Sequence, residues 1–395
     1  MLATQEIKLE KNTFTNWKQV KLGEILKVKS GEGLTALQMK DGGQYAVYGG
    51  NGINGYFDKY IVEEPTLIIG RVGAKCGVMH VTKPKSWVTD NALMVNFDKK
   101  RVDLKFLYWT LIVANLNKLS VSTAQPVVSG AKIYAVDVLL PPLPEQHRIV
   151  EKIEELFSEL DYAITTLKTT QQQLQTYRQS VLKHAFEGHF TGGMKGWKVD
   201  KVGNLIERMQ YGSSEKSDED ASGIPVLRMG NIQDSKIEFE NLKYLPKNLK
   251  DVNDYLLNEG DVLFNRTNSA ELVGKTGIYK KGMPEAVFAS YLIKVVTNRK
   301  ELLPEYFNYY MNSHFGKKFI KSVVSQNVGQ ANVNGTKLKG MDIQLPKPDV
   351  QKEILNEIET RLSESDYLLQ TINQQLIHAE SLRQSILQRA FSGEL

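Results

Sequence analysis

The sequence lacks most features of secreted, membrane and metal-binding proteins. It has one cysteine, Cys76, which excludes a disulfide framework and a cysteine-based zinc or iron–sulfur site. No apolar run approaches the roughly 18 residues that a membrane-spanning helix needs, and the opening segment MLATQEIKLEKNTF has no apolar stretch of a signal peptide. We therefore expect a cytoplasmic protein. Its 41% apolar and 24% charged residues are those of an ordinary globular chain.

The chain is a tandem repeat. Residues 146–190 and 351–395 align without a gap at an offset of 205 and are identical at 16 of 45 positions. Fainter matches continue upstream, where Trp17-Lys18 corresponds to Trp197-Lys198, and Leu22-Gly23 to Val202-Gly203. The chain is therefore one unit written twice, and each unit has a diverged globular part followed by a retained polar helix.

The two retained segments predict long helices that pair as a coiled coil. Residues 146–186 and 351–391 contain neither proline nor glycine, and apolar residues recur in them at steps of four and three. The expected seam of the first helix is Ile149, Ile153, Leu156, Leu160, Ala163, Leu167, Thr170, Leu174, Tyr177 and Val181. That of the second, less regular, is Leu355, Ile358, Leu362, Leu369, Ile372, Leu376 and Ala379.

The globular parts have the pattern of mixed α+β domains. Short β-branched or aromatic runs at 66–69, 92–95 and 261–264 are bounded by Gly, Asn and Pro, which predicts strands. Amphipathic helices are expected over 104–119 and 305–323. The expected divisions are 1–142, a first globular domain; 143–190, a long helix; 191–345, a second globular domain; and 346–395, a second long helix.

Charge differs between the two kinds of segment. Residues 1–142 carry 18 basic and 12 acidic side chains, and residues 191–345 carry 22 and 18. The helical segments carry 5 against 7 and 5 against 8. This favours a polyanion-binding surface on the globular parts and a protein-binding face on the helices, although ordinary surface charge would explain the excess almost as well.

One family shares this arrangement. Leu140-Pro-Pro-Leu-Pro-Glu-Gln-His-Arg-Ile-Val150 and its repeat Leu345-Pro-Lys-Pro-Asp-Val-Gln-Lys-Glu-Ile-Leu355 both lead into a long helix that ends in Arg-Gln-Ser and Ala-Phe-x-Gly. With the Trp-Lys openings, these segments resemble the conserved regions of specificity subunits of type I restriction–modification enzymes. The second helix start departs from the usual form, because Lys347, Asp349 and Val350 replace Pro142, Pro144 and Glu145.

The resemblance implies a non-catalytic DNA-recognition subunit. Each globular part would be a target recognition domain that reads one half of an asymmetric bipartite site in double-stranded DNA. The helices would pair antiparallel, act as a spacer and dock two methyltransferase subunits, through which motor–nuclease subunits join. S-adenosylmethionine, Mg²⁺ and ATP would be bound by those partners, and no cofactor or metal by this chain.

Candidate DNA-binding residues lie in two polar stretches of each globular part. The stretches 69–77 and 265–277 each follow a predicted strand and share an Arg and a Lys, and the stretches 125–130 and 330–335 precede the last strand. Such loops reach phosphates and base edges, although turn chemistry explains many of the same residue types. The candidates in these stretches are Arg71, Lys75, Gln125, Ser129, Asn265, Arg266, Thr267, Asn268, Lys275, Gln330, Asn332 and Asn334. Ser290 and Tyr291, in a further segment at 288–292 and matched roughly by Asn91 and Ala92, are weaker candidates.

Signatures of catalysis are missing. The only Pro-Pro pair, Pro141-Pro142, lies in Leu-Pro-Pro-Leu and cannot serve as a methyltransferase motif. The Gly274-Lys-Thr276 sequence has Ser269 where a nucleotide-binding loop needs glycine, and the six histidines are scattered. Two other readings remain open: a self-sufficient DNA-processing enzyme with an unrecognised active site, and a coiled-coil scaffold that tethers proteins.

Overall fold

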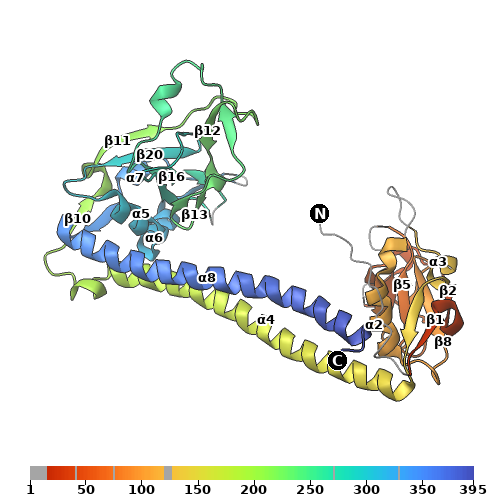
Figure 1. The fold of residues 1–395 in the computed structure, drawn as a ribbon. Coiled ribbons are helices and arrows are strands. Elements are labelled where there is room, and N and C mark those ends of the chain that lie inside the picture. Colours follow the sequence, from red (N-terminus) through yellow and green to blue (C-terminus); the bar gives the residue numbers. More distant parts are fainter. Residues whose placement is uncertain (1–15, 41, 74–75, 120–126, 270–271, 328–329) are drawn as a thin grey trace. The chain divides into compact units, whose positions relative to one another are not determined.

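The computed structural model describes residues 16–40, 42–73, 76–119, 127–269, 272–327 and 330–395 (Figure 1). It divides into two compact units: unit 1 is Met1–Leu167 with Gln374–Leu395, and unit 2 is Lys168–Asn373. The boundary falls within both long helices. Each unit therefore combines one globular part with a segment of each helix. In the described part of the chain, none of the helices has the length and apolarity to cross a membrane.

Unit 1 is built on a four-stranded antiparallel sheet in the order β2-β8-β5-β6, beside a three-stranded sheet β4-β3-β7 in which β3 and β7 are parallel. The chain enters through β1, which pairs with β9 at the start of the long helix. The strands are β1 (Lys18–Lys21), β2 (Leu26–Ser30), β3 (Tyr45–Gly49), β4 (Gly52–Phe57), β5 (Leu67–Gly70), β6 (Met79–Val81), β7 (Trp87–Val88), β8 (Ala92–Phe97) and β9 (Asp137–Leu140). The helices of its globular part are α1 (Leu22–Ile25), α2 (Leu104–Ala114) and α3 (Gly130–Tyr134).

Unit 2 repeats this topology. Its sheets are β11-β20-β16-β18 and β15-β12-β19, again with one parallel pair, and β10 pairs with β23. The strands are β10 (Lys198–Lys201), β11 (Ile206–Tyr211), β12 (Ile224–Leu227), β15 (Lys243–Leu245), β16 (Val262–Asn265), β18 (Thr276–Ile278), β19 (Val287–Phe288), β20 (Leu292–Thr297) and β23 (Asp342–Leu345). Its short helices are α5 (Pro304–Asn312), α6 (His314–Val323) and α7 (Gly335–Lys339). This strand-for-strand agreement confirms the predicted α+β tandem repeat.

Unit 2 has one addition among its described residues, the hairpin of β13 (Ile232–Gln233) and β14 (Lys236–Ile237). Unit 2 also contains a small sheet, β17-β22-β21, formed by β17 (Thr267–Asn268), β22 (Gln330–Asn332) and β21 (Ser325–Asn327). Its β17–β22 pair corresponds to the bridge between Val72 and Val127 in unit 1. The two predicted amphipathic helices are each interrupted. Asn115 takes the left-handed conformation (φ 50°) and ends α2, and extended Ser313 separates α5 from α6. Polar residues with local caps override the apolar periodicity there.

The long helices α4 (Leu143–Phe186) and α8 (Pro348–Phe391) run antiparallel within each unit, as predicted. In unit 1 the start of α4 packs on the end of α8 through Ile153, Phe157 and Ile386. In unit 2 the end of α4 packs on the start of α8 through Val181, Ala185 and Ile358. Each contact belongs to the core of its globular part. The domains are therefore built around the helix ends.

The predicted seam of α4 is correct at eight of its ten residues, which are buried or half-buried, and wrong at two. Ala163 and Tyr177 are exposed, and the neighbouring Ile164 and Arg178 turn inward. The pattern favours apolar residues and so passes over Arg178, whose side chain is only 11% exposed because it is paired with Asp366. The predicted seam of α8 is correct at the seven residues named for it, all of which are buried or half-buried.

A cross-helix ion pair occurs once in each unit. Arg178 contacts Asp366 in unit 2, and Arg383 contacts Asp161 in unit 1. Both members of one pair lie 205 residues from their counterparts in the other, so the two pairs are the same interaction in the two repeats. In unit 2 the pKa of the Asp366 carboxyl is lowered, because Lys236 and Arg178 outweigh the opposing effect of burial.

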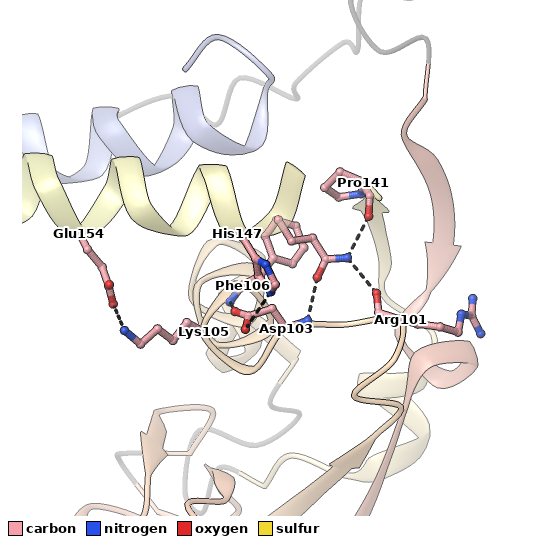
Figure 2. A network of polar contacts seen from close by, with 8 residues as sticks. Arg101, Asp103, Lys105, Phe106, Pro141, His147 and Glu154 are labelled. Carbon is pink, nitrogen blue, oxygen red and sulfur yellow. Dashed lines mark hydrogen bonds and ion pairs between the residues drawn. The ribbon is translucent and has the colours of Figure 1, made fainter. Parts of the chain in front are cut away.

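A buried glutamine attaches each globular part to its helix. Figure 2 shows the unit 1 network: Gln146 Nε2 donates to the carbonyls of Arg101 and Pro141, both at 2.9 Å, and its Oε1 accepts from Asp103 N at 2.8 Å. In unit 2 Gln351 makes the corresponding three bonds to Glu301, Pro346 and Leu303. Both glutamines are fully buried. Because every polar atom is satisfied, the network sets where the domain meets the helix.

Candidate nucleic-acid interface

The two predicted arginines make the same pair of backbone hydrogen bonds in both units, an arrangement called here the arginine frame. Arg71 follows β5; its N–H donates to Asn91 O at 2.9 Å, and its carbonyl accepts from Val128 N at 3.0 Å. Arg266 follows β16 and makes the same two bonds, to Tyr291 O at 3.0 Å and from Val333 N at 2.9 Å. The polar loops identified in the sequence therefore meet at one arginine in each unit. By this frame the counterpart of Asn91 is Tyr291, one residue beyond the rough match to Ser290 expected from the sequence.

The two arginine side chains are held differently. The Arg71 side chain is exposed, with one long bond from Nη1 to Ser30 Oγ at 3.4 Å. The half-buried Arg266 guanidinium lies 5.0 Å from the centre of the Tyr211 ring and donates to Ser290 O at 3.3 Å. A guanidinium pinned by an aromatic face keeps its remaining N–H groups in fixed directions. The Arg266 side chain is thus held in one orientation before DNA binds, whereas the Arg71 side chain can change its conformation.

Two predicted candidates of unit 2 prove to be interior residues. Asn265 has no exposed surface, and its Nδ2 donates to Leu272 O at 3.5 Å. Thr267 is 7% exposed, and its Oγ1 accepts from Asn332 Nδ2 at 3.0 Å across the β17–β22 pair. The prediction that these two side chains contact DNA is wrong, because strand pairing turns both of them inward. Asn332 and Asn268 remain half-buried beside them.

Several other candidates have local structural roles. Asn334 caps α7, since its Oδ1 accepts from Lys337 N at 2.9 Å, and Ser129 is exposed at the corresponding cap of α3. Gln330 lies in β22. Lys75 and Gln125 lie outside the described residues.

A cavity of about 480 Å³ beside the Arg266 frame contains residues that sequence reasoning missed or ranked low. Its lining includes Arg228, Gln233 and the half-exposed Tyr291, together with two carboxylates, Glu238 and Glu240. Predicted Lys275 reaches the same place, since its Nζ donates to Gln233 Oε1 at 3.0 Å. A cation, an amide and an aromatic ring side by side are the groups that read base edges and stack on bases. No pattern in the sequence pointed to Arg228 or Gln233, because they join the site only through long-range contacts.

Lys317, on α6, lies near two other lysines, Lys275 and Lys321. Burial lowers the pKa of Lys317, and the nearby charges of Lys275 and Lys321 lower it further, while Asp234 opposes them. Such a cluster favours an anionic ligand. Within the described residues, no group of three or more His, Cys, Asp and Glu side chains is placed to hold a metal ion.

Comparison with known proteins identifies the class. The model of the type I restriction modification DNA specificity domain matches residues 15–176 and again 194–378. The chain is 27% identical over 330 residues to the StySPI specificity subunit of Salmonella potsdam, and 28% identical over 333 residues to the EcoKI specificity subunit of Escherichia coli K12. Each match covers 82% of this chain and 68% of the relative.

A solved chain from a study of assembly and conformational transition of a type I restriction–modification system has the same fold. It superposes with a TM-score of 0.75 at 16% identity and covers 96% of this chain and 99% of that chain. The chain belongs to the family of type I restriction modification DNA specificity domains and contains two of them. It is accordingly a DNA-specificity subunit of a type I restriction–modification system, as the sequence predicted.

Proposed function

We propose that each unit reads one half of an asymmetric, bipartite site in double-stranded DNA. The observation that supports this most directly is the shared frame around Arg71 and Arg266. Because each unit presents the same arginine arrangement, the two units can contact two DNA half-sites in the same way. The side chains around the arginine differ between the units, so each unit can select different bases. Tyr291 and the β13–β14 hairpin belong to unit 2, whereas Asn91 occupies the Tyr291 position in unit 1.

The paired helices serve as the docking element for two methyltransferase subunits, and motor–nuclease subunits join through those. Methyl transfer, ATP hydrolysis and strand cleavage take place on the partners, which bind S-adenosylmethionine, Mg²⁺ and ATP. This chain contributes recognition alone: lysines and arginines neutralise phosphates, and each unit selects the bases of its half-site.

A modified-base map of the source genome, with and without this gene, tests the proposal. We expect methyladenine to disappear from one gapped, asymmetric motif when the gene is deleted. Exchange of residues 1–142 for those of a relative with a different motif should then change one half of the motif only. An unchanged map in cells that express the full system contradicts the proposal.

A further inference from the structure

One buried amide organises the cavity beside the arginine frame of unit 2. The side chain of Asn231 is only 4% exposed, and its Oδ1 accepts from Arg228 N at 2.9 Å. Its Nδ2 donates to Glu238 O at 3.0 Å and to Glu240 O at 2.8 Å. Asn231 therefore fixes the backbone of all three charged residues that line the cavity, before any ligand binds.

The Arg228 side chain is held beside one of these glutamates. The half-buried guanidinium donates through Nη2 to the carbonyl of Asn241, the residue that follows Glu240. Within the described residues, neither Arg228 nor Glu240 forms an ion pair, so both charges remain available to a ligand. The cavity thus offers a donor fork and a carboxylate acceptor close together.

Unit 1 has no side chain at the position of Arg228. Strands β12 and β3 each have a parallel neighbour, and Leu227 and Tyr48 hold equivalent register positions in the two pairs. The next residue is Arg228 in unit 2 and Gly49 in unit 1. The two units therefore differ at an equivalent point of the sheet, beside the cavity of unit 2.

We propose that Arg228 and Glu240 read one G·C base pair through the major groove of the half-site that unit 2 recognises. This inference rests on the proposed function. On its major-groove edge a G·C pair presents two acceptors, guanine N7 and O6, and then one donor, the cytosine amino group. An arginine beside a carboxylate complements that order, because the guanidinium donates to guanine and the carboxylate accepts from cytosine.

The same chemistry disfavours the other possible contacts of Arg228. The carboxylates of Glu238 and Glu240 repel phosphate, so an arginine in this cavity suits a base edge better than the DNA backbone. Adenine presents N7 as an acceptor but an amino group where guanine has O6. The second N–H of the arginine fork would then face another donor, so an A·T pair fits less well.

The test compares duplexes that carry each single base-pair change in the half of the motif that exchange of residues 1–142 leaves unaltered. Their affinities are measured by fluorescence anisotropy with the full chain bound to its methyltransferase subunit. At one position the unaltered chain should prefer G·C by about 10–100-fold, and Arg228→Ala should lose that preference alone. Arg228→Lys should lose it too, because lysine keeps the charge without the fork. Glu240→Gln should weaken it at the same position.

Modified bases at that position test which groove is read. In 7-deazaguanine a C–H group replaces N7, so the unaltered chain should bind about 10-fold more weakly, and Arg228→Ala should be indifferent to the change. Hypoxanthine keeps N7 and O6 and lacks only the amino group of the minor groove, so it should bind as guanine does.

Arg299→Ala is the matched control. Its exposed side chain also donates through Nη2 to a backbone carbonyl, that of Glu259, but it lies beyond the opposite end of β20 from Tyr291. It should leave both affinity and base preference unchanged. Circular dichroism checks that each variant is folded.

Three results would overturn the inference while the proposed function stands. Arg228→Ala weakens binding to every duplex equally, which would make Arg228 a phosphate contact; it relaxes an A·T position; or it leaves every preference intact. If the unaltered chain itself shows no base preference in either half of the motif, the proposed function fails as well.

Discussion

Units 1 and 2 share their sheet order and their contacts with the long helices, and they differ in residues inside the sheets. The Gln146 and Gln351 networks, the cross-helix Arg–Asp pairs and the order of the sheets are the same in both. At matching sheet positions, however, unit 1 has Thr66 and Met94 where unit 2 has Asp261 and Lys294. The contacts that join each domain to the helices are therefore retained, whereas residues inside the sheet have diverged.

The buried pair of unit 2 is the clearest internal difference. Lys294 Nζ lies 3.8 Å from Asp261 Oδ2 with both side chains almost fully buried, and it donates to Leu256 O at 3.0 Å. Burial raises the pKa of Asp261 and lowers that of Lys294. A desolvated pair of this kind adds little net stability compared with apolar residues, but it is costly to break on one side only.

The largest expected effect concerns the shared arginine frame. Arg71→Ala and Arg266→Ala should each weaken binding to the DNA motif by about 10–100-fold, since one arginine contact is worth roughly 1–3 kcal/mol. Together they should abolish specific binding. Fluorescence anisotropy at fixed salt measures both, and the single variants should lose discrimination in different halves of the motif.

Arg101→Ala provides the control for these variants, because its exposed side chain lies away from the frame and only its carbonyl bonds to Gln146. Unchanged affinity of the double arginine variant, with folding intact, would show that the frame is not the DNA-binding site.

Substitutions at the buried Asp261–Lys294 pair can give unit 2 the residues that unit 1 has at these positions. Lys294→Met leaves Asp261 buried without its cation and should cost about 3 kcal/mol of the free energy of unfolding. The double change Lys294→Met with Asp261→Thr installs the unit 1 residues and should recover most of that loss. Urea unfolding followed by circular dichroism measures the free energy of unfolding of each variant. A double variant no more stable than Lys294→Met alone would contradict the expected recovery.

The smallest expected effect tests whether the Gln146 and Gln351 networks are equivalent. Gln146→Met and Gln351→Met each leave three backbone groups without a partner and should each cost about 2 kcal/mol. The two losses should agree to within about 0.5 kcal/mol, as measured by denaturation of each single variant. A loss confined to one unit would mean that the two attachments are not equivalent.

The sequence by itself determined the repeat and the long helices, because periodicity and an internal offset are visible without coordinates. Its conserved segments also indicated the family, and the antiparallel pairing of the helices followed from that resemblance. It also singled out Arg71 and Arg266, because they recur after equivalent strands.

Only the tertiary structure decided which polar residues face outward. Asn265 and Thr267 have the composition of a binding loop, yet strand pairing buries them. Arg178 was passed over as a seam residue because its partner Asp366 lies 188 positions away. Arg228 and Gln233 join the site through contacts with residues distant in sequence. Burial and long-range pairing are properties of the folded chain, and a local pattern does not carry them.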